Sequence, residues 1–213
     1  MKKLQHIIMI ALILLGLVTP ALAQEQTDDF NVSAKHAIAI EATTGKVLYE
    51  KDATTPDGVA SMTKILTAYM VYKAVDQGKI TWDTEVDISD YPFNLTVDSE
   101  VSNVPLDSRK YTVKQLLDAT LISSANSAAI ALAEKISGSE SAFVDAMTAQ
   151  LKEWGITDAK LFNASGLNNK YLGDNRYPGS KPDDENTMSA LDVAIIADHL
   201  DRKSTRLNSS HRL

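Results

Sequence analysis

Residues 60–69 read Ala-Ser-Met-Thr-Lys-Ile-Leu-Thr-Ala-Tyr, and the interpretation of the fold starts from this stretch. Apolar residues recur there at helical spacing, which predicts a helix from about Ser61 to Gln77. Side chains three residues apart lie on the same face of a helix, so Lys64 can reach the hydroxyl of Ser61. Ser-x-x-Lys occurs only here in the chain.

This pair has the chemistry of an activated nucleophile, because a serine hydroxyl is weak until a base takes its proton. None of the four histidines is a plausible partner, so a neutral lysine amine is the expected base. The ordinary lysine pKa of about 10.4 makes neutrality at pH 7 cost roughly 4–5 kcal/mol, which a buried or positively charged pocket must supply. The helix N-terminus also offers free N–H groups to an oxyanion. The alternative is that Ser61 is a plain N-cap and Lys64 is exposed one turn later.

A second polar motif, Ser124-Ala125-Asn126, falls where two predicted helices meet. The first helix starts at a capping box on Thr112, and the second begins near Asn126. A turn at this point can aim both polar side chains into a cleft, where Ser124 would relay a proton and the Asn126 amide would hold a peptide. The alternative is that both residues only cap backbone groups at a helix junction.

The remaining segments combine one hairpin with further helices. Alternating residues over 36–41 and 46–50, around a Thr-Thr-Gly turn, predict a β-hairpin. Other predicted segments are a helix opened by Ser139, a surface loop over residues 168–186 and a last helix capped by Ser189 and ending at His199. Two strands seldom form a stable sheet domain, so strands are expected to be missing after residue 200.

Both motifs in this order resemble the active-site set of penicillin-binding proteins and class A β-lactamases. The wider likeness is to the low-molecular-weight penicillin-binding proteins that are D-alanyl-D-alanine carboxypeptidases of the peptidase S11 type, and it covers residues 36–200. The stretches that carry it are residues 41–49, 60–69, 121–128, 163–167 and 187–192.

The resemblance implies an α/β (α+β) fold of the β-lactamase/transpeptidase type, with an antiparallel sheet flanked by helices and a helical subdomain that bears Ser124. It implies a serine hydrolase that removes the terminal D-Ala from peptidoglycan stem peptides through an acyl-enzyme on Ser61. Lys64 would be the general base, Ser124 the proton relay and Asn126 the residue that orients the peptide. β-Lactams would acylate the same serine as inhibitors, and neither a cofactor nor a metal is expected.

One motif of the resembled family is absent. Lys-Thr-Gly does not occur, and residues 44–46 carry the same letters in another order. In the family this motif lies on a strand that binds the substrate carboxylate and helps complete the oxyanion hole; losing one oxyanion donor typically costs about 10²–10³ in rate. We therefore expect the C-terminal sheet strands to be missing and the truncated chain itself to be impaired or inactive.

Three alternative functions remain open on the same residues. A D,D-endopeptidase that cuts cross-links would use the same groups. A β-lactamase needs a further carboxylate, usually in Glu-x-x-Leu-Asn, and Glu153 is followed by Trp-Gly-Ile-Thr instead. A non-catalytic wall-binding pseudoenzyme is favoured only by the absent Lys-Thr-Gly.

The composition excludes several other classes. The 213-residue chain has a formal net charge of −7 and no block of basic residues before its last dozen positions, which argues against nucleic-acid binding. It contains no cysteine, so thiol catalysis and cysteine-ligated metals are excluded. A zinc peptidase is disfavoured because the spacing His-Glu-x-x-His is absent.

The first residues predict export. Lys2 and Lys3 precede an apolar run over residues 7–18 and the small-x-small pattern Ala21-Leu22-Ala23. We interpret residues 1–23 as a cleaved signal peptide; the alternative, a membrane anchor, needs about 20 apolar residues. The expected location is outside the cytoplasm, associated with the cell envelope or secreted, and contact with a membrane surface is expected only through a missing C-terminal region.

The domain organisation predicted after the signal is a partial transpeptidase-like domain over residues 24–200 and a tail over residues 201–213. The tail holds three of the five arginines, Arg202, Arg206 and Arg212, among Ser, Thr and Asn. We interpret it as non-native sequence added to a truncated gene product. The alternative is a genuine basic tail.

Overall fold

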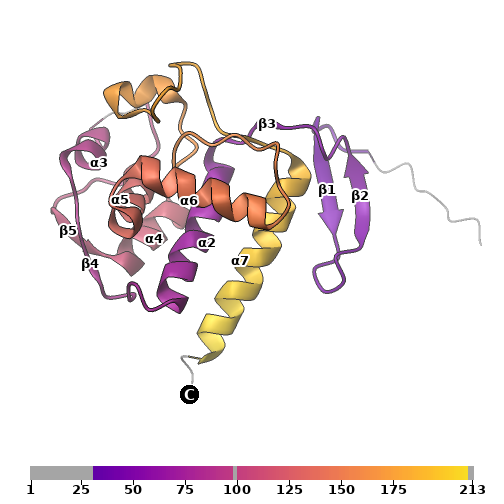
Figure 1. Cartoon of the computed structure of the whole chain (residues 1–213), viewed down its shortest axis with the longest axis horizontal. Coiled ribbons are helices and arrows are strands. Elements are labelled where there is room, and N and C mark those ends of the chain that lie inside the picture. Colours follow the sequence, from indigo (N-terminus) through magenta and orange to yellow (C-terminus); the bar gives the residue numbers. More distant parts are fainter. Residues whose placement is uncertain (1–30, 98–99, 211–213) are drawn as a thin grey trace, which may run out of the picture. The chain divides into compact units, whose positions relative to one another are not determined.

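A computed structural model describes residues 31–97 and 100–210 of the chain. The described residues from Ala34 onward belong to one unit, and the elements below are those of that unit. Figure 1 shows its helices gathered around α2, Thr63–Asp76, with α7, Ala190–Ser210, running beside it. The predicted signal peptide, residues 1–23, lies outside the described residues.

The central helix α2 follows a 3₁₀ turn, η1, at Ala60–Met62. It packs most extensively against α7 and also against α4, α5 and α6. Its buried residues divide between two core clusters, with Val71 in one and Leu66 in the other. The helix predicted over residues 61–77 is therefore confirmed, and it is stabilised by burial on more than one side.

The predicted hairpin is also confirmed. Strand β1, Ala37–Ile40, pairs antiparallel with β2, Val47–Lys51, with Ala37 opposite Lys51. The connecting turn includes Gly45, whose φ of 72° lies in the left-handed region that favours glycine. β1 packs against α7, and this contact attaches the hairpin to the helices.

The helical lobe contains α4, Val113–Ile122, α5, Asn126–Ser137, and α6, Glu140–Glu153. The capping box predicted at Thr112 is present, because its side chain and that of Gln115 each bond the other's backbone N–H. Gly138 ends α5 with a φ of 83°. Ser139 then caps α6 by accepting a hydrogen bond from the backbone N–H of Ala142.

Within the described residues the strands form three separate antiparallel pairs. Besides the hairpin, the pairs are β3, Asp57–Gly58, with β6, Thr187–Met188, and β4, Glu85–Asp87, with β5, Lys110–Thr112. The predicted loop over residues 168–186 contains two 3₁₀ turns, η2 at Asn169–Tyr171 and η3 at Gly173–Asn175.

One helix, α3 at Asp90–Leu95, was not predicted from the sequence. Its contacts come from residues distant in the chain, so the local sequence pattern does not predict it. The Arg109 guanidinium lies 3.7 Å from the centroid of the Phe93 ring and donates a 2.8 Å hydrogen bond to Asp90.

The last helix is longer than predicted. We expected it to end at His199, whereas α7 continues to Ser210. No glycine or proline interrupts this stretch, and Arg202 bonds Asp198 one turn earlier as well as the carbonyl oxygen of Ala42. Lys203 pairs with Asp76 of α2. The boundary proposed at residue 200 therefore falls inside a helix, and the origin of residues 201–213 stays a prediction.

None of the helices in the described part of the chain combines the length and the apolar character needed to cross a membrane.

Candidate active site

Ser61 lies in the η1 turn that leads into α2, and it is exposed. The turn is entered through Ala60, whose φ of 42° is in the left-handed region. A non-glycine residue at such an angle costs roughly 1–3 kcal/mol and persists only where its surroundings hold it. The backbone before the serine is therefore held in place by its neighbours.

In the described chain the amine of Lys64 lies among three oxygen acceptors. Nζ is 3.0 Å from Ser61 Oγ, 2.7 Å from Asn126 Oδ1 and 2.7 Å from the carbonyl oxygen of Ser165. Lys64 is only 3% exposed, and this burial lowers its pKa from 10.5 to about 8. None of these acceptors is a carboxylate, so no negative charge in contact with the amine opposes the loss of its proton.

Lys64 Nζ donates to all three oxygens in this structure, and loss of one proton would turn the amine into a base for Ser61. A neutral amine has two N–H donors and one lone pair. The two shorter contacts, to Asn126 and Ser165, can take both donors, which leaves the lone pair facing the Ser61 hydroxyl. The predicted burial of Lys64 is confirmed, and the alternative of an exposed lysine is excluded.

Ser124 lies in the connection between α4 and α5, as the sequence predicted. Its φ of 54° is again left-handed. Its hydroxyl is 2.9 Å from Ser61 Oγ, so the second motif meets the first across 63 positions of sequence. The hydroxyl of Ser61 therefore lies between the Ser124 hydroxyl and the Lys64 amine.

Asn126 is brought to the same place but makes contacts other than the expected ones. Its Oδ1 accepts from Lys64, its Nδ2 donates to the carbonyl oxygen of Ser102 at 2.9 Å, and the residue is 3% exposed. The side chain thus positions Lys64 in this structure. Its predicted role in orienting a peptide stays a prediction.

A tight turn over residues 163–167 contacts Lys64 and the backbone that precedes Ser61. Ser165 supplies the carbonyl that accepts from Lys64. Gly166 has a φ of 76°, and a Cβ there would lie 1.8 Å from the carbonyl oxygen of Ala60. Only glycine permits this close approach, so the turn and the backbone before Ser61 are packed directly against each other.

Side-chain amides hold this turn in shape. Asn163 Oδ1 accepts from the backbone N–H of Gly166 at 2.6 Å. Asn186 Nδ2 donates to the carbonyl oxygen of Asn163 at 2.9 Å and to Thr63 Oγ1 at 3.1 Å. The first residue of α2 and the turn are therefore linked through one buried amide.

Two of these residues, Ser165 and Gly166, were not among the predicted site residues. The sequence signal was the turn over residues 163–167, which the family resemblance included without giving it a role. Ser165 acts through its backbone carbonyl, and a backbone acceptor has no signature in the residue type. Gly166 is required by a contact with Ala60 that only the folded chain shows.

A cavity of about 330 Å³ opens at the two serines. Its walls include Ser61, Lys64 and Ser124 on the polar side and Met62, Ile65 and Leu121 on the apolar side. The site therefore presents a hydroxyl, a second hydroxyl and a buried amine to a molecule that enters it, which is the equipment for acyl transfer to serine.

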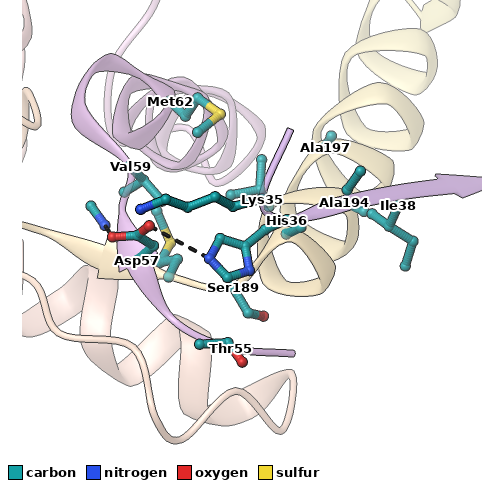
Figure 2. A pocket seen from close by; sticks show the side chains of 15 residues that line it. Lys35, His36, Ile38, Thr55, Asp57, Val59, Met62, Ser189, Ala194 and Ala197 are labelled. Carbon is teal, nitrogen blue, oxygen red and sulfur yellow. Dashed lines mark hydrogen bonds and ion pairs between the residues drawn. The ribbon is translucent and has the colours of Figure 1, made fainter. Parts of the chain in front are cut away.

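A second cavity, of about 600 Å³, contains none of the predicted site residues. Figure 2 shows it between the start of β1, the β3 segment and α7, with Met62 at its edge. Ile38, Ala194 and Ala197 are among the residues of its apolar wall. His36, Thr55 and Ser189 are among its polar lining residues.

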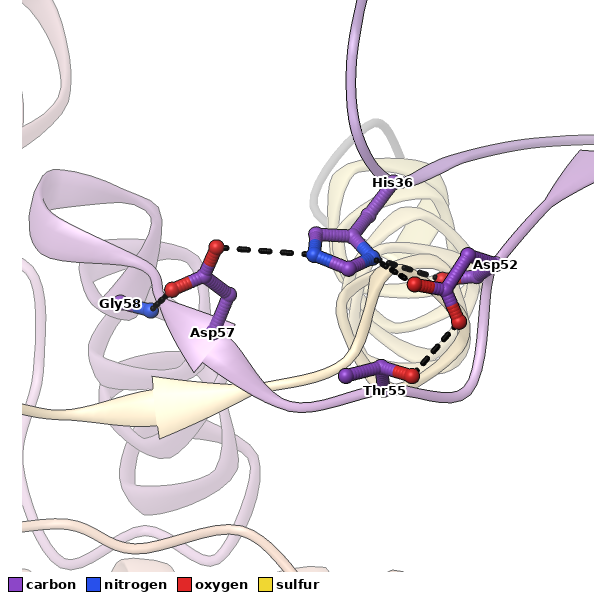
Figure 3. Close-up of polar contacts among 5 residues, drawn as sticks. All are labelled: His36, Asp52, Thr55, Asp57 and Gly58. Carbon is purple, nitrogen blue, oxygen red and sulfur yellow. Dashed lines mark hydrogen bonds and ion pairs between the residues drawn. The ribbon is translucent and has the colours of Figure 1, made fainter.

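His36 lies between the carboxylates of Asp52 and Asp57 (Figure 3). Its Nδ1 is 3.0 Å from Asp52 Oδ2, and its Nε2 is 3.5 Å from Asp57 Oδ2. Thr55 donates to Asp52, and the backbone N–H of Gly58 donates to Asp57. The cluster attaches the start of β1 to the segment that leads to Ser61.

Within residues 31–97 and 100–210, no group of three His, Cys, Asp or Glu side chains is placed to hold a metal ion. The groups gathered at Ser61 are hydroxyls, an amine, an amide and a carbonyl.

Comparison with known proteins gives the site its context. The family model described as D-alanyl-D-alanine carboxypeptidase, peptidase S11, matches residues 22–211. A curated relative, the D-alanyl-D-alanine carboxypeptidase DacF of Bacillus subtilis, is 34% identical over 203 residues, which are 94% of this chain and 48% of that protein.

Solved structures agree with this match. The crystal structure of a peptidoglycan synthesis regulatory factor, PBP3, from Streptococcus pneumoniae has 63% identity and a TM-score of 0.82, and the alignment covers 83% of this chain and 48% of that one. The cefotaxime-bound form of penicillin-binding protein D2 from Listeria monocytogenes has 25% identity and a TM-score of 0.66, with 81% of this chain and 63% of that one covered. The fold class expected from the sequence is confirmed by these neighbours. The chain spans about half the length of the curated relative, at 48%.

Proposed function

Because the chain belongs to the D-alanyl-D-alanine carboxypeptidase family, peptidase S11, we propose that Ser61 is the nucleophile of a serine hydrolase that removes the terminal D-Ala from peptidoglycan stem peptides. One observation carries this proposal: the buried amine of Lys64 and the hydroxyl of Ser124 both lie within hydrogen-bond distance of Ser61 Oγ. The whole protein's activity is proposed here, since the chain covers 48% of its curated relative.

The reaction follows from the order of the three groups. The lone pair of Lys64 takes the proton of Ser61, and Oγ attacks the carbonyl carbon of the penultimate D-Ala. The tetrahedral intermediate collapses, the C–N bond to the terminal D-Ala breaks, and the leaving amine receives a proton through the Ser124 hydroxyl. That proton comes from Lys64, which is then neutral again. Lys64 next takes a proton from water, the hydroxide attacks the acyl-enzyme, and the shortened peptide leaves as Lys64 returns the proton to Ser61 Oγ.

β-Lactams are proposed to acylate the same serine. They are cyclic amides, so the amine released when Oγ opens the ring stays covalently attached to the acyl-enzyme. The solved relative from Listeria monocytogenes with cefotaxime bound supports this part of the proposal. Export through residues 1–23 is also proposed, because the substrate lies outside the cytoplasm.

Labelling with a fluorescent penicillin tests the proposal. We expect the complete protein to be labelled at Ser61, Ser61→Ala to show no labelling, and Ser123→Ala, a neighbouring serine outside the Ser61 contacts, to label like wild type. Labelling that persists in Ser61→Ala would overturn the assignment. Analysis of products from cross-linked and uncross-linked wall peptides then separates endopeptidase from carboxypeptidase activity.

A non-catalytic wall-binding role is the second candidate. A chain that binds peptides ending in D-Ala-D-Ala but is not labelled by penicillin would support it. A β-lactamase is disfavoured, because the carboxylate of Glu153 accepts from Gln150 at 2.9 Å and lies 4.0 Å from Lys73. Glu153 therefore makes its contacts outside the group at Ser61.

A further inference from the structure

Glu140 is a buried carboxylate outside the Ser61 group. It is the first residue of α6 and is only 7% exposed. Its Oε1 accepts from the backbone N–H of Ala164 at 2.9 Å, and its Oε2 accepts from the hydroxyl of Tyr91 at 3.0 Å. Among its ion pairs and hydrogen bonds in the described chain there is no cation. Burying a carboxylate without a cation costs folding free energy, so we expect Glu140 to have a role in the contacts that it makes.

The surroundings of Glu140 favour its neutral form. Burial raises its pKa from 4.5 to about 7, while the hydrogen bonds from Ala164 and Tyr91 oppose that rise. Glu134 of α5 adds a smaller rise through its negative charge. The groups that face Glu140 are therefore Tyr91 from α3, Glu134 from α5 and the amide of Ala164 from the turn.

The contact between Glu140 and Ala164 connects Glu140 to the proposed base, Lys64, through the backbone of the turn. The carbonyl oxygen of Ala164 accepts from Thr67 Oγ1 at 2.6 Å, so this residue is held on both sides of its backbone. The next residue, Ser165, supplies the carbonyl that accepts from Lys64. Glu140 is thus connected to the Lys64 amine by two hydrogen bonds and the backbone of two residues, Ala164 and Ser165.

We propose that Glu140 is a positioning residue for Lys64: its carboxylate fixes the Ala164 amide and so places the Ser165 carbonyl that directs the Lys64 amine toward Ser61. This inference rests on the proposed function and deepens it by naming what holds the base. Glu140 itself does not contact Ser61, Lys64 or Ser124 in any recorded interaction of the described chain. Its effect is exerted through the position of the turn.

The test measures the protonation of Lys64 by NMR titration of its side-chain carbon signals, assigned with Lys64→Gln. In Glu140→Leu the turn loses its anchor, the Ser165 carbonyl moves, and the ammonium loses an acceptor. We expect the midpoint for Lys64 to move to lower pH and labelling of Ser61 by fluorescent penicillin to slow at least tenfold. Glu140→Gln can still accept from Ala164 and donate to Tyr91, so it should keep both properties near wild type.

Val144→Ala is the matched control, since Val144 is 1% exposed on the same helix and touches the turn through no recorded polar contact. It should lower the melting temperature but leave the Lys64 midpoint unchanged. If the role of Glu140 were purely structural, Glu140→Leu would give this same result. If Glu140→Leu does not fold, Glu140→Asp replaces it, because its shorter carboxylate cannot reach Ala164 and Tyr91 together.

An unchanged Lys64 midpoint in a folded Glu140→Leu or Glu140→Asp variant overturns the inference. A midpoint that moves equally in Val144→Ala overturns it as well. The NMR reading needs no activity, so failure of penicillin to label the complete protein would reject the proposed function while the role of Glu140 is still decided.

Discussion

Lys64 is an amine surrounded by oxygen atoms that carry no net charge: a hydroxyl, an amide and a backbone carbonyl. Such acceptors orient an ammonium but stabilise it less than a carboxylate would. Burial removes water at the same time, and the pKa falls to about 8. At pH 7 roughly a tenth of the molecules therefore hold the amine in its basic form.

This protonation state predicts the pH dependence of acylation. The neutral form grows as pH rises, so the rate of Ser61 labelling by penicillin should increase between pH 7 and pH 9 with a midpoint near 8. Lys64→Arg cannot supply a neutral base and should lose about 10²-fold or more in rate. Lys73→Arg, on the same helix but bonded to Gln150, is the control and should keep the profile. A midpoint near the ordinary lysine value would contradict the role of burial.

Much of the residue-scale picture could be predicted, because Ser61 and Lys64 are three positions apart where the η1 turn leads into α2. The meeting of Ser124 with Ser61 followed from the family resemblance and not from local spacing. Ser165 could not be predicted, since it acts through a backbone carbonyl 101 positions from Lys64. The contacts of Asn126 also differ from the expected ones, because its amide is occupied by Lys64 and Ser102.

At the scale of elements, the turn over residues 163–167 is the support of the site. It lies against the backbone of Ala60 through Gly166, accepts from Lys64 through Ser165 and is tied to α2 through Thr67 and Asn186. A shift of the turn would therefore move the serine and the lysine together. Rigid support of this kind keeps catalytic groups within a fraction of an ångström of their working positions.

A single added methyl group tests this support. Gly166→Ala places a Cβ 1.8 Å from the carbonyl oxygen of Ala60 at a φ of 76°, so something must shift. We expect a loss of about 3 kcal/mol or more in the free energy of unfolding, from overpacking and backbone strain together. Gly173→Ala is the matched control: its φ is 54°, its Cβ would meet nothing within 4 Å, and it should cost only about 1–2 kcal/mol. Urea unfolding measures both, and equal losses would contradict the close packing.

The elements themselves were predictable where local chemistry sets their ends. The capping box at Thr112, the N-cap Ser139 and the glycines after α5 and α6 gave boundaries close to those observed. The helix α3 escaped prediction because Arg109 holds it from outside the segment. The extension of α7 beyond His199 escaped it because Lys203 and Arg202 are fixed by Asp76 and Ala42, which are distant in sequence.

At the scale of the described unit, the two cavities differ in character. The one at Ser61, about 330 Å³, has amine and hydroxyl groups in its wall. The other, about 600 Å³, lies between β1 and α7 and has Ile38, Ala194 and Ala197 in an apolar wall. Contiguous apolar surface that is open to water attracts apolar molecules.

The chain should therefore bind an apolar dye such as anilinonaphthalene sulfonate in its folded state. Ala194→Asp puts a charge on the wall of the larger cavity and should reduce the dye fluorescence severalfold. Ala149→Asp makes the same substitution at an exposed position of α6, away from the cavity, and should leave the fluorescence unchanged. Equal signals from both variants would mean that the dye binds elsewhere.

The arrangement around Ser61 also fixes the direction of its hydrogen bonds. In the structure Ser124 donates to Ser61, and the Lys64 amine donates to Ser61, Asn126 and Ser165. Once the amine is neutral, its lone pair accepts from the Ser61 hydroxyl instead. Every donor in this relay then points the same way. When Ser61 is acylated its proton passes to Lys64, and the same groups then carry a proton in the other direction, through Ser124 to the leaving amine. Exchange of solvent hydrogen for deuterium therefore slows the transfer of several protons at once. The rate of acylation should then fall non-linearly as the deuterium fraction of the solvent rises.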